Sequence, residues 1–301
     1  MQDASSSSRG LWLGLLGVTL FAATLPMARI ATGTVQGPLM SALFIAMGRA
    51  MVAGMLSLCL LAWMRAKRPV REDWPALAMT AGGVVFGFPF FTSLAMRHVP
   101  AVHASVILGV LPLATAIVGA WLHRQRPSRM FWLCGILGCA WVVGYALLRA
   151  GSTFATLHLQ AADLMLFVAM ACAAVGYGFG GRLSKHMQAE HVICWALVIS
   201  LPITTPLAIW SWPDIEIPLI SWGAFAYMSV FSMWLGFFAW YRGLALGGTV
   251  RVSQVQLVQP FLGMLFSVPL LGETLDMQSL VFGLGVIVIV FLSKKAPVHP
   301  R

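Results

Sequence analysis

Long apolar runs alternate with short polar stretches from one end of this 301-residue chain to the other. A helix that crosses a bilayer needs about 20 mostly apolar residues. We expect ten such spans, at 10–31, 39–64, 74–95, 101–122, 130–149, 161–181, 192–212, 219–240, 250–271 and 277–293. Strands are not expected, because the runs are too long and lack the alternation of a membrane barrel. The pattern predicts an all-α membrane protein with ten transmembrane helices.

Composition supports this class. Hydrophobic residues make up 59% of the chain and charged residues only 9%, against roughly 25% charged residues in soluble domains. The net charge of +10 would indicate nucleic acid binding in a soluble protein, but here the polar loops are too short to form a basic face. We therefore expect the lipid bilayer and a small molecule as partners, and no nucleic acid. The five cysteines lie inside apolar runs without metal-ligand spacing, so no metal, disulfide or cofactor is expected.

The basic residues predict the orientation of the spans. With the N-terminus in the cytoplasm, most of the 19 Lys and Arg residues fall in cytoplasmic loops, as the positive-inside rule requires. The acidic pairs Asp214 with Glu216 and Glu273 with Asp276 then fall outside. We expect a multi-pass protein of the cell (inner) membrane with both termini in the cytoplasm. The oligomeric state stays open, with a monomer favoured over an oligomer.

One stretch of the chain occurs twice. A shift of 148 positions lays Val99–Ala150 on Gly247–Val298 without a gap, and the matching pairs include Ser105 with Ser253, Pro112 with Pro260 and Gly135 with Gly283. The unit has five spans, an odd number, so the second half should enter the membrane inverted. The polar loops agree, because 123–129 is basic and 272–276 is acidic. We expect residues 1–150 and 151–301 to form two inverted five-helix repeats around a central cavity, which is a transporter architecture.

Several short motifs occur in a characteristic order. They are Gly48-Arg49, Pro112, Ala162-Asp163-Leu164, Pro260, Leu271-Gly272-Glu273 and Phe282-Gly283-Leu284-Gly285. Over essentially the whole chain this set resembles the EamA-type transporters of the drug/metabolite transporter superfamily. The resemblance implies export of amino acids and related metabolites through a cavity lined by spans one, three, four, six, eight and nine. The chain departs from the family at Arg124-Gln125-Arg126, where Gly-Glu is frequent.

The ninth span carries small and polar residues at helical spacing. They are Thr249, Ser253, Gln256, Pro260, Gly263 and Ser267. Such groups turn away from lipid, toward a cavity or another helix. We expect Gln256 and Ser253 to bind substrate, with Ser105 and His103 as candidates on the fourth span; close helix packing is the alternative. Pro112 and Pro260 each remove a backbone hydrogen bond, and could act as hinges, as substrate contacts or as plain kinks, the kink being favoured.

Aromatic residues form a second stripe, on the eighth span. They are Tyr227, Phe231, Trp234, Phe238 and Tyr241, and Phe86 and Phe90 lie on the equivalent third span. We expect Trp234, Phe238, Phe86 and Phe90 to form walls of the cavity; the alternative is a lipid-facing or interfacial surface. Tyr177 in the sixth span and Thr24 in the first are further candidate substrate contacts.

Charged and titratable residues in or near the spans bear on the mechanism. Arg49 must pair, snorkel or face water, and a structural role near the outer end is favoured over substrate binding. None of the nine acids lies in mid-span, so we expect no strong proton coupling; His98 and His103 are the near-span groups that titrate near neutrality. A drug pump for cations usually places an acid in its cavity, whereas a zwitterion needs paired polar groups and backbone dipoles.

Enzyme motifs such as His-Glu-x-x-His, Gly-x-Ser-x-Gly and the Walker loop are missing from the sequence, which disfavours an enzyme. The prediction is therefore a transporter that exports amino acids or related small metabolites by alternating access. The alternative is a broad-specificity drug/metabolite efflux pump, and a membrane enzyme or scaffold is less favoured.

Overall fold

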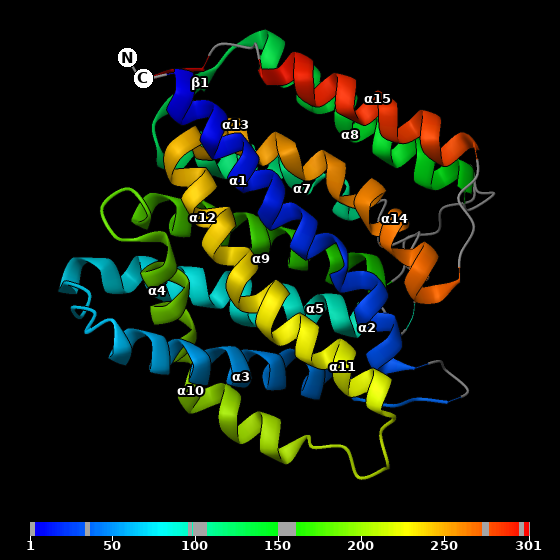
Figure 1. The fold of residues 1–301 in the computed structure, drawn as a ribbon. Coiled ribbons are helices and arrows are strands. Elements are labelled where there is room, and N and C mark those ends of the chain that lie inside the picture. Colours follow the sequence, from blue (N-terminus) through cyan, green and yellow to red (C-terminus); the bar gives the residue numbers. More distant parts are fainter. Residues whose placement is uncertain are drawn as a thin grey trace.

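The computed structural model describes residues 4–33, 37–95, 98, 107–149, 161–272, 277–294 and 298–300. They form a bundle of packed helices (Figure 1). The elements of the first half are α1 (Ala4–Ala22), α2 (Thr24–Thr32), α3 (Ala42–Trp63), η1 (Arg71–Asp73), α4 (Trp74–Thr80), η2 (Ala81–Gly87), α5 (Phe88–Ala95), α7 (Leu111–Leu122), β1 (Gln125–Pro127) and α8 (Arg129–Arg149). Those of the second half are α9 (Ala161–Leu183), α10 (Ala189–Trp210), α11 (Leu219–Tyr227), η4 (Met228–Leu235), α12 (Gly236–Gly247), α13 (Thr249–Ser253), η5 (Gln254–Val258), α14 (Gln259–Leu271), α15 (Met277–Lys294) and β2 (Val298–Pro300).

Seven helical stretches in the described part are long and apolar enough to cross a membrane. They are Ser7–Thr32, Ala42–Trp63, Arg71–Ala95, Ala161–Leu183, Ala189–Trp210, Leu219–Gly247 and Thr249–Leu271. Three shorter apolar helices lie at Leu111–Leu122, Arg129–Tyr145 and Val281–Leu292. Many large apolar side chains on the outside of the bundle are exposed, among them Leu58, Leu164 and Leu284, as expected where lipid replaces water. The predicted all-helical, multi-pass membrane fold is confirmed, and the count of ten spans stays a prediction.

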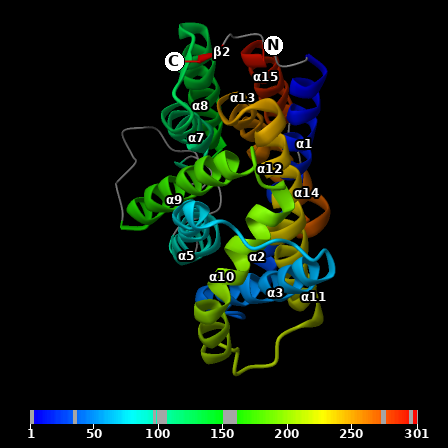
Figure 2. The ribbon, with the colours of Figure 1, turned by 90° about the vertical axis from the view of Figure 1, so that its left-hand side faces the viewer.

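Neighbouring helices pack in pairs. Helices α8 and α15 lie side by side at one edge of the bundle, and α3 and α10 lie side by side at the opposite edge (Figure 1, Figure 2). Between these edges, α1 crosses α12, and glycines of both helices form the contact. A Cβ placed at Gly243 would lie 2.7 Å from the backbone nitrogen of Gly14. Glycine is needed here, because any side chain would force the two backbones apart.

Two helices contain π-helical segments. These are η2 in the stretch Arg71–Ala95 and η4 in the stretch Leu219–Gly247. A π-helical turn holds more residues than an α-helical turn, so it rotates the following side chains about the helix axis, and such segments are frequent at functional sites. Two other helices restart at a proline: Pro112 stands in the first turn of α7 and Pro260 in the first turn of α14.

Candidate functional site

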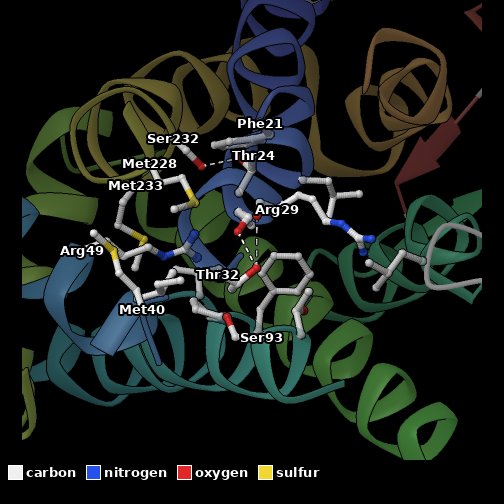
Figure 3. Close-up of a pocket in the computed structure, with 18 of the residues that line it drawn as sticks. Phe21, Thr24, Arg29, Thr32, Met40, Arg49, Ser93, Met228, Ser232 and Met233 are labelled. Carbon is white, nitrogen blue, oxygen red and sulfur yellow. Dashed lines mark hydrogen bonds between the residues drawn. The ribbon is translucent and has the colours of Figure 1, made fainter. Parts of the chain in front are cut away.

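A cavity of about 400 Å³ lies inside the bundle, where elements of both halves meet (Figure 3). Its lining comprises Phe21, Thr24, Leu25, Ala28, Arg29, Thr32, Gly33, Pro38, Met40, Ile45, Arg49, Val84, Phe88, Pro89, Thr92, Ser93, Leu108, Tyr177, Met228, Ser232, Met233, Phe237 and Gln259. The volume falls within the range of small-molecule binding pockets, roughly 300–1,000 Å³. Both π-helical segments contribute, with Val84 from η2 and three residues from η4.

Aromatic side chains form one end of the cavity. The rings of Phe21 and Phe237 lie 5.0 Å apart between centroids, and the ring of Tyr177 lies 5.3 Å from that of Trp240. Trp240 and Tyr241 are fully buried behind the lining residues, one turn further along α12. The Tyr241 hydroxyl donates to the Gly176 carbonyl oxygen at 3.1 Å, which holds α12 against α9. We call Phe21, Tyr177, Phe237, Trp240 and Tyr241 the aromatic floor.

The opposite end of the cavity lies beside the segment that joins α2 to α3. Gly33 and Pro38 form an isolated antiparallel bridge, and both line the cavity together with Met40. Arg29 on α2 also lines this end and is exposed. Gly33 has a φ of 73°, a value that glycine adopts without strain. The cavity therefore approaches the surface at the end of α2, away from the start of α1.

Hydroxyl groups supply most of the neutral polar surface. The Thr24 and Ser232 oxygens lie 2.8 Å apart in a hydrogen bond that joins α2 to η4. The Thr32 hydroxyl donates to the Ala28 carbonyl oxygen of its own helix at 2.9 Å. The buried Thr92 hydroxyl has no hydrogen-bond partner in the described part of the chain. The cavity thus has both satisfied hydroxyls and one that a ligand could satisfy.

Arg49 brings a positive charge into the cavity. It lies two turns into α3, and only 7% of the residue is exposed. Figure 3 shows its guanidinium pointing toward the middle of the cavity, whereas Arg29 extends away from it. Placing an arginine at the centre of a membrane helix costs about 2.5–3.5 kcal/mol, so a favourable interaction should offset this cost. Among the described residues, Arg49 has no ion-pair partner, and its Nε has no hydrogen-bond partner.

Polar contacts gather at the other end of the bundle, where α1 begins; we call this the N side. Arg251 donates to Ser7 at 3.1 Å. Asp73 forms a hydrogen bond with His186 at 2.9 Å, and an ion pair between Glu190 of α10 and Arg242 of α12 spans 3.2 Å. With the glycine contact between α1 and α12, these interactions hold the helices together beyond the aromatic floor.

His123 links three elements on the N side. Its Nδ1 accepts from the Lys185 ammonium at 3.0 Å, which leaves Nε2–H to donate to the Thr249 hydroxyl at 3.0 Å. Burial and the positive charges of Lys185 and Arg182 lower the pKa of His123 to about 4. Burial and Arg182 likewise lower the pKa of Lys185. The imidazole is neutral at physiological pH, as this pair of hydrogen bonds requires.

Comparison with known proteins gives a consistent result. Two stretches of the chain, 8–147 and 160–294, match the model of the EamA-like transporter family. The chain belongs to this family. It is 37% identical over 289 residues to the uncharacterized transporter YdeK of Bacillus subtilis (strain 168), covering 94% of this chain and 96% of YdeK.

More distant matches agree with this EamA assignment. The inner membrane protein YtfF of Escherichia coli (strain K12) is 22% identical over 265 residues, which cover 79% of this chain and 82% of YtfF. A solved crystal structure shares the fold with a TM-score of 0.73 at 18% identity, covering 95% of this chain and 96% of the other. The resemblance predicted from the short motifs is therefore confirmed at the level of the family.

The predicted site residues of this EamA protein are not all near the cavity. Thr24 and Tyr177 line it. Trp234 and Phe238 are half-buried and pack edge to face with centroids 5.1 Å apart, outside the lining. Phe86 also lies outside the lining, and Phe90 lines a separate hollow between α3, α5 and α10.

The predicted polar residues of the ninth span are buried in the bundle. The Ser253 hydroxyl donates to the Val250 carbonyl oxygen at 2.8 Å. Gln256 is 3% exposed, and both polar atoms of its amide lack a hydrogen-bond partner among the described residues. Neither residue is in the lining, and neither is Pro112 or Pro260. His103 and Ser105 lie outside the described residues. The substrate-binding roles of all these residues stay predictions.

The residues that line the cavity lie next to the predicted aromatic stripe rather than on it. In the second half, Ser232, Met233 and Phe237 line it, one or two positions before Trp234 and Phe238. A stripe drawn at 3.6 residues per turn does not allow for the extra residue of a π-helical turn. The sequence marked Arg49 as a charged residue inside an apolar span and favoured a structural role for it. The structure places it in the cavity lining.

Proposed function

We propose that this EamA-family protein exports amino acids or related small metabolites by alternating access. The observation that carries the proposal is the cavity, which lies between the two halves, approaches the surface near Gly33 and Pro38, and ends at the aromatic floor. A transporter must expose its site to one side of the membrane at a time. The contacts on the N side keep the floor closed in this arrangement.

The proposal includes ten membrane-spanning helices arranged as two inverted five-helix repeats, 1–150 and 151–301. The paired irregularities support it. The π-helical segments begin at Ala81 and Met228, nearly the 148-residue spacing of the sequence repeat, and Pro112 and Pro260 follow that spacing. Both irregularities occur in the same helices of each half, as expected when one five-helix unit has been duplicated.

The proposed setting is the cell (inner) membrane, with both termini in the cytoplasm, so that the cavity opens to the outside. The similarity to YtfF, an inner membrane protein of Escherichia coli, supports this location. We propose transport without strong proton coupling, because none of the chain's nine acids falls within a predicted mid-span region. We also propose that the protein acts as a monomer. Membership of a transporter family favours transport over an enzymatic or scaffold role.

Broad-specificity drug efflux is the second candidate function. A cavity with many apolar side chains, including Phe21, Phe88 and Met233, favours it. Lipophilic drugs that carry a positive charge would need a nearby carboxylate, and the described lining contains arginine and no acid. We therefore favour substrates that carry a carboxylate.

Uptake into proteoliposomes tests the proposed function. Purified protein is reconstituted and exposed to a panel of labelled amino acids, with protein-free liposomes as the control. We expect downhill uptake of apolar or aromatic amino acids above the control, and little further accumulation when a pH gradient is imposed. Absence of uptake for the whole panel, together with uptake of cationic dyes, would favour the drug-efflux candidate.

Thiol labelling tests the proposed orientation. In a cysteine-free background, Arg68→Cys places a thiol in the loop before α4, and Asp214→Cys places one in the loop after α10. An impermeant thiol reagent added outside intact cells should label the cysteine at 214 and not the one at 68. Labelling at 68 from outside would contradict the orientation.

A further inference from the structure

The guanidinium of Arg49 has no negative partner in the described part of the chain. Two acidic side chains with partners there, Asp73 with His186 and Glu190 with Arg242, lie on the N side. The neighbouring Tyr177 is a neutral phenol, which supplies no negative charge at neutral pH. A buried arginine whose Nε lacks a hydrogen bond, aimed into a cavity, is a group that still requires a ligand.

The cavity lining contains no carboxylate among the described residues. The sequence of 34–36 and of 96–106, which flank the lining segments, contains no Asp or Glu either. The neutral polar groups of the described lining include the hydroxyls of Thr24, Thr92 and Ser232. The site therefore offers a cation and neutral hydrogen-bonding groups to whatever enters it.

We propose that Arg49 binds the negatively charged group of the transported molecule, and that the substrate class is organic carboxylates with an apolar body. This inference rests on the proposed function and names the chemistry of its site. A guanidinium presents a planar fork of donors that matches a carboxylate at two points. The Thr92 hydroxyl, which lacks a partner among the described residues, can donate to the same anion.

The rest of the cavity selects the body of the ligand. Phe21, Phe88, Met228, Met233 and Phe237 give it apolar and aromatic walls. The exposed Arg29 at the surface end adds a second positive charge, which attracts anions toward the entrance. No charged group in the described lining complements an ammonium. An amino acid would thus be held by its carboxylate, and the same molecule without its ammonium should lose little binding affinity.

Three phenyl compounds of similar shape separate the contributions of the carboxylate and the ammonium to binding. Phenylpropionate has the carboxylate alone, phenylalanine has both charged groups, and phenethylamine has the ammonium alone. Binding is measured on the full-length protein in detergent, by the shift of thermal unfolding with ligand concentration. We expect both carboxylates to bind and phenethylamine to bind at least about tenfold more weakly, since hydrogen bonds to charged groups are worth about 1.5–3 kcal/mol. Equal binding of phenethylamine and phenylpropionate, or no binding of either carboxylate, overturns the proposal.

Substitution of Arg49 gives the second measurement. Arg49→Gln removes the charge and should weaken phenylpropionate binding by about tenfold to a hundredfold. Arg49→Lys keeps the charge without the planar fork and should retain part of the affinity. Arg68→Gln, in an exposed loop, is the matched control and should bind like wild type. Wild-type affinity in folded Arg49→Gln overturns the proposal; if that variant does not fold, the comparison of probes on the wild type decides.

Flux of the same probes distinguishes this inference from the proposed function. Carboxylate binding that depends on Arg49, without flux in wild-type proteoliposomes, contradicts transport and supports the anion site. Flux of phenylalanine that is unchanged in Arg49→Gln supports transport and contradicts the anion site. Flux that is lost in Arg49→Gln and retained in Arg68→Gln supports both.

Discussion

The hydroxyl oxygens of Thr24 and Ser232 lie 2.8 Å apart in the cavity lining and join the first half of the chain to the second. The two residues are 208 positions apart in the sequence. Thr24 begins α2, and Ser232 lies within the π-helical η4. Because the bond crosses between halves that alternating access would move relative to each other, it stabilises the arrangement in which the cavity approaches the surface.

A double-mutant cycle tests this bond. Thr24→Val and Ser232→Ala should each cost about 0.5–1.5 kcal/mol of stability, the value of one hydrogen bond. The double variant should cost little more than either single one, because both remove the same bond. Thermal unfolding in detergent measures all four proteins. Thr32→Val is the control, since its hydroxyl bonds within its own helix; fully additive effects of the pair would contradict a direct bond.

Gln256 supplies a second prediction. Its amide is buried without partners among the described residues, and an unsatisfied buried polar group costs about 1–3 kcal/mol. Gln256→Leu should therefore raise or maintain the thermal stability. If the Gln256 amide forms hydrogen bonds with substrate, or with protein groups in another state of the transport cycle, the same variant should transport more slowly.

Flux in proteoliposomes and thermal unfolding separate the two effects for Gln256. Val288→Ala, on an exposed position of α15, is the control and should change neither quantity. Wild-type flux in a stabilised Gln256→Leu protein would show that the residue has only a packing role.

The depressed pKa of His123 predicts a pH dependence of stability. Its pKa is about 4 in the folded protein against a reference of 6.5, so between these values the unfolded chain binds more protons. Stability contributed by this site is complete above about pH 6.5 and is lost as the pH falls toward 4. We expect thermal unfolding of the wild type to move to lower temperature across this window.

The control for this pH dependence is His123→Gln, which keeps a hydrogen-bonding side chain and cannot titrate. Its unfolding temperature should change less over the same pH range. Parallel curves for the two proteins would contradict the assignment of this pH dependence to His123.

Apolar periodicity predicted the helical membrane fold because every span must satisfy its backbone hydrogen bonds within itself. The sequence also singled out Thr24 and Tyr177 as polar groups in otherwise apolar runs, and both line the cavity. It did not predict the π-helical turns or that Ser232, Met233 and Phe237 would line the cavity. These turns depend on packing between helices, which no local pattern records.

Tertiary packing also decided the position of the charged groups. The sequence marked Arg49 as costly inside the membrane, yet the direction of its side chain depends on how α3 lies against η4 and α10. The link from Lys185 through His123 to Thr249 joins three segments far apart in the chain. Such a link is visible only once the ends of α7, α9 and the start of α13 are placed together.

We propose that the cavity is the transport pathway and opens to the outside. Ser93 lines it and is half-buried, so Ser93→Cys in a cysteine-free background places a thiol on its wall. The measurement is the flux of a labelled amino acid that the wild type transports, before and after an impermeant thiol reagent is added from outside. We predict that labelling abolishes flux and that excess substrate slows the labelling. Complete labelling with undiminished flux would contradict the claim.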